Sequence, residues 1–234
     1  MVSKESGAGD LDALFGRPGR RSTAGTSLPK AAAGGLTPEL SGLVRQFDDA
    51  GRDAERIAGG LSERQFNWRS SSGRWSIAEC FGHLNMIGSE LLPLIDAAIG
   101  EARRHAWYRQ GTLRVGFVGR RLIAATEPPV RSKRRARPEH VAAGDQAVDL
   151  VLSALLDLNR QFGARVRAAT GLDISRPKVA AFGAKVFRLN LYELLLVLAA
   201  HERRHLSQAQ AVKDDPGLPR RAAIAPPAPP RAQR

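Results

Sequence analysis

The sequence has few of the features that mark secreted, disulfide-linked or membrane-spanning proteins. Cys80 is its only cysteine, which excludes an intramolecular disulfide and is typical of a reducing compartment. The longest apolar run, residues 194–200, is far shorter than the roughly 20 residues that a spanning helix needs. The first residues lack the apolar core of a secretory signal. We therefore expect a soluble, cytoplasmic protein with no membrane partner.

Aromatic residues are also scarce, at 6% of the 234 residues. Hydrophobic residues nevertheless make up 43% of the chain, so it can bury a substantial core made mainly of Leu, Ala, Val and Ile. We find no repeat of 20–50 residues, which argues against a solenoid.

Acidic residues are outnumbered by basic ones, and the net charge is +13. The excess lies near both termini and above all in residues 101–140, which hold 11 basic and 3 acidic residues, including the basic run 131–137. Such a segment can bind phosphates without sequence specificity. No nucleic-acid-binding motif accompanies it, so we favour a solvated loop and expect no specific nucleic-acid partner.

The hydrophobic pattern predicts an all-α fold, a four-helix bundle, with a long connector between its second and third helices. We expect helices at about 38–58, 77–103, 146–169 and 191–212, and a short helix near 117–125 inside the connector 104–144. The helix starts are marked by capping residues, namely Thr37, Ser76 with Glu79, Asp145, and Asn190 with Glu193. The bundle domain spans 36–213, between a disordered tail at 1–35 and a disordered Pro/Ala-rich tail at 214–234.

Two histidines, His201 and His205, stand one turn apart in the last predicted helix. They continue the apolar seam of that helix and should point into the bundle. His83 has the same relation to the seam of the second helix, which consists of Cys80, Ile87, Leu91 and Leu94. A bundle that packs the two helices together can bring three imidazoles to one divalent ion.

Three neutral imidazoles with an open position make a catalytic type of zinc site, and nickel or ferrous iron accepts the same ligands. The alternative is that each histidine is a core residue with a hydrogen-bond partner. For His83 alone that alternative is favoured. For the pair it is not, because packing gives no reason for two histidines in a seam of leucines. His105 and His140 receive no role.

The stretch His201-Glu202-x-x-His205 also matches the zincin peptidase pattern. A zincin needs a further histidine or glutamate ligand downstream, and the chain has neither after His205. We therefore disfavour a peptidase.

Two motifs resemble those of the DinB/YfiT-like superfamily: residues 75–85, WSIAECFGHLN, and residues 201–208, HERRHLSQ. Smaller similarities lie at 61–62, 67–68, 171–176 and 182–183, so the resemblance covers roughly 36–213. It implies a four-helix bundle of unusual connectivity and a metal, often zinc or nickel, on His83, His201 and His205. Some members of that superfamily are bacillithiol- or mycothiol-dependent S-transferases, others are isomerases or hydrolases, and many have no known activity.

The leading hypothesis is a metal-dependent transferase that uses a low-molecular-weight thiol, whose pKa the ion would lower. Gln208, one turn beyond His205, and more weakly Asn85 are candidates to contact the thiol or a small-molecule substrate. One alternative is a metal-activated hydrolase, which needs a general base. Glu79 is interpreted as a helix cap, and Glu202 should point away from the histidine face. A second alternative is a non-catalytic, stress-related ligand-binding bundle. Homodimerisation through helix faces is left open.

Overall fold

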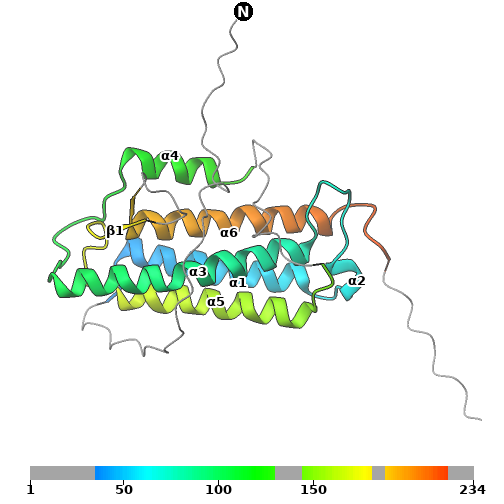
Figure 1. Ribbon diagram of the computed structural model, residues 1–234, viewed down its shortest axis with the longest axis horizontal. Helices are drawn as coiled ribbons and strands as arrows, with labels where there is room; N and C mark the ends of the chain where they lie inside the picture. The colour runs from blue at the N-terminus through cyan, green and yellow to red at the C-terminus, as the bar shows by residue number, and fades with distance from the viewer. Residues whose placement is uncertain (1–34, 130–143, 181–187, 221–234) are drawn as a thin grey trace, which may run out of the picture.

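The computed structural model of the chain describes residues 35–129, 144–180 and 188–220. Those residues form six helices and two very short strands (Figure 1). In chain order the elements are α1 (Pro38–Ala58), α2 (Glu63–Phe66), α3 (Ile77–Arg104), α4 (Phe117–Thr126), α5 (Val148–Ala168), β1 (Lys178–Val179), β2 (Leu189–Asn190) and α6 (Leu191–Lys213). The all-α class is confirmed.

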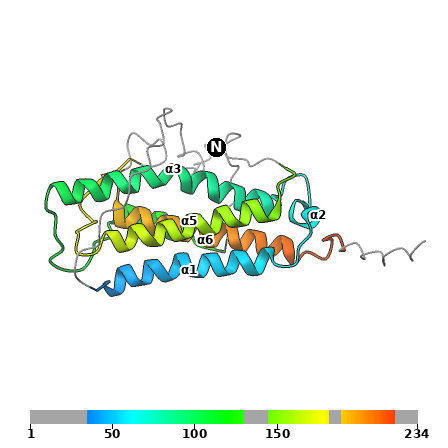
Figure 2. The ribbon, with the colours of Figure 1, turned by 90° about the horizontal axis from the view of Figure 1, so that it is seen from below.

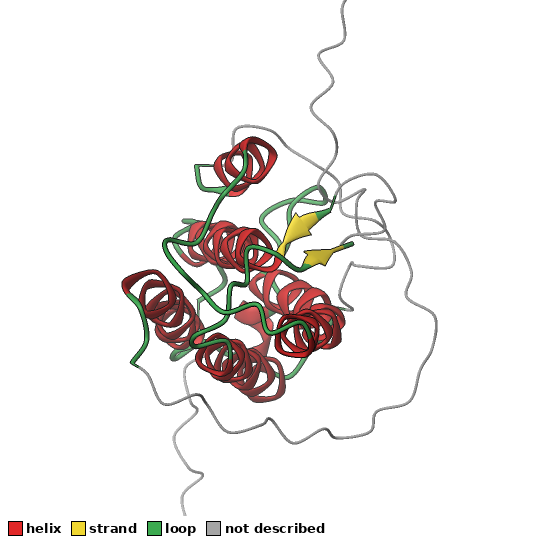
Figure 3. Ribbon diagram, turned by 90° about the vertical axis from the view of Figure 1, so that its left-hand side faces the viewer, coloured by secondary structure: helices red, strands yellow, loops and turns green. Residues whose placement is uncertain are grey.

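The four long helices α1, α3, α5 and α6 lie side by side (Figure 2). Both α1 and α3 pack against α5 and α6, so the apolar faces of all four helices enclose one core. Phe47 of α1 meets Phe162 of α5 with ring centroids 5.0 Å apart. The short helix α4 packs on the outside of α6, and β1 pairs with β2 in an antiparallel arrangement just before α6 begins (Figure 3).

Capping side chains fix where the helices that carry the histidines begin. At α3, the Ser76 hydroxyl accepts a hydrogen bond from the Glu79 backbone N–H, and the Glu79 carboxylate accepts one from the Ser76 N–H. Asn190 and Glu193 form the same reciprocal pair at the start of α6. These pairs satisfy backbone donors that a helix start leaves open, and they confirm the predicted starts of both helices.

The start of α5 differs from the prediction. Asp145 does not cap it, because this residue has a left-handed backbone with φ of 57° and the N-cap position is Ala147, which has no side-chain cap. The side chain of Asn67 instead holds the chain before α5. It accepts from the Gln146 N–H and donates to the Gln146 carbonyl, at 2.9 Å each.

Two further differences concern the seam of α3 and the ordered C-terminal end. Leu94, expected in the buried seam, is 37% exposed, one residue after Pro93 inside the helix. The described chain continues past α6 to residue 220, and the Pro219 carbonyl accepts a hydrogen bond from Gln65 at 2.8 Å.

Several sequence predictions concern residues that the structure does not describe. Most of the two predicted tails, the basic run 131–137, His140 and the motif residues 182–183 lie outside the described residues. Within the described residues, no helix is long and apolar enough to cross a membrane.

Candidate metal centre

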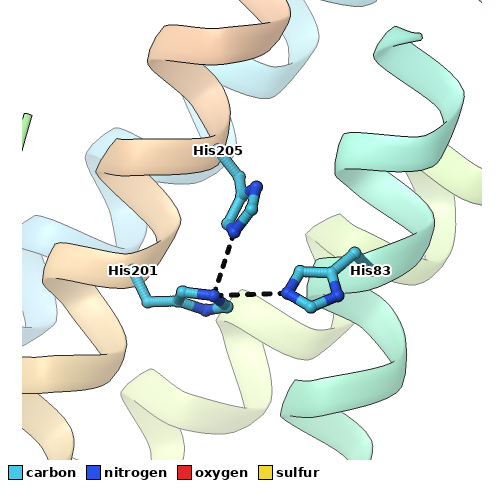
Figure 4. Close-up of side chains that lie close together, drawn as sticks. All are labelled: His83, His201 and His205. Atoms are coloured by element: carbon cyan, nitrogen blue, oxygen red, sulfur yellow. Dashed lines mark hydrogen bonds between the residues drawn. The ribbon is translucent and has the colours of Figure 1, made fainter. Parts of the chain in front are cut away.

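Three buried histidines converge between α3 and α6 (Figure 4). The Nε2 atom of His201 lies 3.3 Å from Nε2 of His83 and 3.0 Å from Nε2 of His205. One ligand nitrogen from each ring can be chosen so that all three lie within 4.8 Å of one another. The structure thus brings together the three side chains that the sequence pattern selected.

Helical periodicity explains why the rings meet. His201 and His205 are one turn apart on α6 and share its buried face with Leu194, Leu198 and Val212. His83 lies in the second turn of α3, and the capping pair at Ser76 fixes the helical register that turns it inward. Because α3 packs directly on α6, the two faces place the three imidazoles opposite one another.

Burial keeps two of these rings neutral. It is the largest cause that lowers the pKa of His201 well below its ordinary value of 6.5, followed by the charges of His83 and Arg204. The pKa of His205 is lowered for the same main reason, and the nearby His201, His83 and Arg204 lower it further. A neutral imidazole retains a lone pair on one ring nitrogen, which is the form that binds metals.

The arrangement fits a metal ion better than it fits hydrogen bonds alone. The Nε2 atom of His201 faces two other Nε2 atoms, yet a neutral ring nitrogen offers either one proton or one lone pair. Nitrogen ligands about 2.0–2.1 Å from a tetrahedral zinc ion would lie about 3.3–3.4 Å from one another. The distances of 3.0 and 3.3 Å are close to that spacing.

Trp75 forms one wall of the site, a role that sequence reasoning missed. Its indole stacks on His205, with centroids 5.4 Å apart and ring planes 19° apart. It also contacts His83 at a centroid distance of 5.0 Å. Trp75 therefore contacts candidate ligands from both helices. Its place immediately before the cap residue Ser76, two turns ahead of His83, was the available signal in the sequence.

The two carboxylates nearest to the histidines in sequence are both engaged. Glu79 is buried, and its oxygens bind the Arg69 guanidinium as well as the backbone N–H of Ser76. Glu202 is buried against α5, where its two oxygens lie 2.8 and 2.9 Å from the Asn159 amide nitrogen in the amide orientation that satisfies both groups. Burial raises the pKa of Glu202 well above 4.5, although the charge of Arg203 opposes this.

The two residues expected to contact a thiol or substrate have different surroundings. Gln208 is half-buried on α6, and its side chain interacts with His205, which slightly offsets the lowered pKa of that ring. Asn85 donates a hydrogen bond to the Val151 carbonyl of α5 at 3.0 Å. The binding roles of both residues remain predictions. His105 lies at the C-terminal cap of α3, where it stacks on Trp107.

Comparison with models of protein families identifies the family of the chain. The family model described as the DinB superfamily matches residues 46–209, which include all three histidines. Comparisons with curated proteins and with solved structures give no match.

Proposed function

Because this chain belongs to the DinB superfamily and brings three buried imidazoles together, we propose that it is a metal-dependent enzyme. The single observation that carries this proposal is the convergence of the Nε2 atoms of His83, His201 and His205 from two helices. Zinc is the ion we propose first, and nickel or ferrous iron fits the same three nitrogens.

For the reaction, we propose transfer of a low-molecular-weight thiol, of the bacillithiol or mycothiol type, onto an electrophilic small molecule. His83, His201 and His205 would hold a divalent ion, which would lower the pKa of a thiol bound to it. The protein's own residues hold and orient that centre. Burial keeps His201 and His205 neutral, and the indole of Trp75 fixes ring orientation.

Electrostatics around the centre support an anionic thiol. Arg204 is buried, and its positive charge lowers the pKa of both His201 and His205. A cation this close to the centre favours the anionic thiolate form of a bound thiol. Gln208, half-buried beside His205, is the side chain we propose for a hydrogen bond to the bound thiol.

The hydrolase alternative receives less support from the surrounding acids. A hydrolase needs a general base within reach of the substrate's water. Glu79 is held by Arg69 and by the α3 cap, and Glu202 is held by Asn159 with a raised pKa that favours its protonated form. Both carboxylates are thus engaged away from the open side of the centre, and neither is placed to take a proton from a water that attacks a substrate.

The thiol proposal is tested by isothermal titration of bacillithiol, mycothiol and glutathione into the zinc-loaded protein. We expect saturable binding of at least one thiol, weaker binding to a Gln208→Ala variant and none to the zinc-free protein. The His105→Ala variant is the matched control, because it removes an exposed histidine outside the centre, and it should bind as the wild type does. Zinc-loaded protein that binds none of these thiols would contradict the transferase proposal while leaving the metal centre intact.

A further inference from the structure

The chain between Glu101 and Glu127 is strongly basic. Residues 102–126 contain six arginines and no acidic residue. The same stretch holds three of the five large hydrophobic side chains that are exposed in the described residues, namely Tyr108, Phe117 and Val118. Exposed arginines and exposed large hydrophobic side chains therefore occur together in this segment, and such combinations can mark a binding surface.

Helix α4, at the end of this stretch, is held firmly on α6. The Gly116 N–H, at its N-terminal cap, donates to the Glu193 carboxylate at 2.6 Å. Beyond its C-terminus, Glu127 pairs with Arg203 of α6. Gly119 allows the two helices to approach closely, because a Cβ there would lie 2.6 Å from Glu193 Oε1. The orientation of α4 is therefore set by contacts at both ends.

The outer face of α4 carries the exposed side chains. Phe117 is 69% exposed and Val118 is 50% exposed, and both lie in the first turn. Arg120 and Arg121 are exposed as well. At about 100° per residue, the exposed positions 117, 118, 120, 121, 124 and 125 fall on one side of the helix, while Gly119 and Thr126 face the protein. Figures 1 and 3 show α4 outside the group of four long helices, next to α6.

We propose that the outer face of α4 docks on an anionic lipid surface. Amphipathic surface helices that bind membranes combine arginine or lysine with phenylalanine or aliphatic side chains that enter the boundary of headgroups and acyl chains. Here Arg120 and Arg121 would pair with lipid phosphates, and the side chains of Phe117 and Val118 would enter the boundary of headgroups and acyl chains. Nucleic acid is the weaker match, because an exposed valine contributes nothing to phosphate contacts or base stacking. The inference contradicts the sequence expectation of no membrane partner, which rested on the lack of a spanning segment and did not address surface binding.

The test is flotation of the full chain with vesicles of phosphatidylcholine alone and of equimolar phosphatidylcholine and phosphatidylglycerol. We expect binding to the anionic vesicles alone. The substitutions Arg120→Gln and Arg121→Gln should each weaken binding to the anionic vesicles about fivefold. The double substitution Phe117→Ser and Val118→Ser should weaken binding to the anionic vesicles by about tenfold or more. All of these positions are exposed, and circular dichroism checks that each variant keeps its helix content.

Matched controls come from α5, which lies on the other side of the bundle (Figure 1). Leu150 is 72% exposed, and Arg160 is exposed as well, so Leu150→Ser and Arg160→Gln remove similar groups away from α4. Both should bind vesicles as the wild type does. A Phe117→Trp variant should show blue-shifted emission on anionic vesicles, and a Leu150→Trp variant should not.

Three outcomes would overturn the proposal. The first is no binding to anionic vesicles. The second is binding that the α4 variants leave unchanged, which would assign it to other basic segments. The third is wild-type protein that binds duplex DNA of random sequence more tightly than vesicles and loses that binding with Arg120→Gln, which would make the face a nucleic-acid surface.

Discussion

At the end of the bundle where α3 begins, Trp75 stacks on His205 with ring planes 19° apart. Near the opposite end of α3, Trp107 stacks on His105 with ring planes 17° apart and centroids 4.9 Å apart. The two stacks have nearly the same geometry. Their surroundings differ, since His205 is buried beside two other imidazoles, whereas His105 is exposed and the Arg176 guanidinium lies 5.2 Å from the Trp107 ring.

The comparison shows which features of a histidine indicate a metal site. An indole stack occurs at both ends, so it does not identify a site by itself. Burial, which lowers the histidine pKa, and convergence of ring nitrogens from two helices occur together where α3 begins. Within the described residues, the three histidines there are the one group of at least three His, Cys, Asp or Glu side chains whose ligand atoms come this close.

The largest effect on metal binding is expected from replacing one of the two tryptophans and not the other. Trp75→Ala should lower zinc affinity about 10–100-fold, the range seen when groups that orient metal ligands are removed. Trp75→Phe should keep most of the affinity, because a phenyl ring can still pack on His205. Trp107→Ala is the control and should bind zinc as the wild type does. Competition with a chromophoric chelator measures the zinc affinity of all three variants. Equal zinc affinity for Trp75→Ala and the wild type would show that the Trp75 stack does not support the metal centre.

A smaller effect is expected from pH on the metal-free protein. The folded pKa values of His201 and His205 are lowered, so the unfolded chain binds more protons below about pH 6.5, and stability falls as pH falls. The raised folded pKa of Glu202 acts in the opposite direction, because above about pH 4.5 the folded state keeps a proton that the unfolded chain loses. Two histidines against one glutamate leave a net difference of close to one proton at about pH 5–5.5, where the slope is about 1.4 kcal/mol per pH unit, and the slope falls towards zero at about pH 6.5.

Urea unfolding between about pH 5 and 6.5 measures this slope. A Glu202→Gln variant removes the opposing group, so its slope relative to the wild type should roughly double. A slope in the variant equal to that of the wild type would show that Glu202 does not hold its proton in the folded state.

The smallest effects concern two glycines of α3, one nearer each end. A Cβ at Gly88 would lie 2.3 Å from a methyl carbon of the buried Leu158, so Gly88→Ala should destabilise the protein by about 1–2 kcal/mol. A Cβ at Gly100 would lie 3.3 Å from the flexible end of Arg104, so Gly100→Ala should raise stability by up to about 1 kcal/mol through helix propensity. Urea unfolding of both variants measures the change in the free energy of unfolding. Changes of equal sign would contradict the close packing of Gly88 on Leu158 or the open surroundings of Gly100.

Much of the fold and the whole histidine set could be predicted from local patterns. The bounds of α1 were marked by Thr37 and Gly59, and α3 and α6 by their reciprocal caps, because a cap and the helix it starts are neighbours in sequence. The histidines could be found because their spacing follows the buried stripe of each helix.

What could not be predicted depends on contacts between distant segments. Asn67 rather than Asp145 holds the chain before α5, through hydrogen bonds to a residue 79 positions away. Glu202 was correctly separated from the histidine face, yet its burial against Asn159 depends on how α5 packs beside α6. Periodicity gives the face of one helix and does not say which side chain of another helix it meets.

Whether His83, His201 and His205 hold a metal ion is tested by elemental analysis of protein purified without a histidine tag, in the wild type and in the His201→Ala and His105→Ala variants. We expect close to one divalent ion per chain in the wild type and in His105→Ala, and almost none in His201→Ala. Equal metal content in the wild type and in His201→Ala would contradict this expectation.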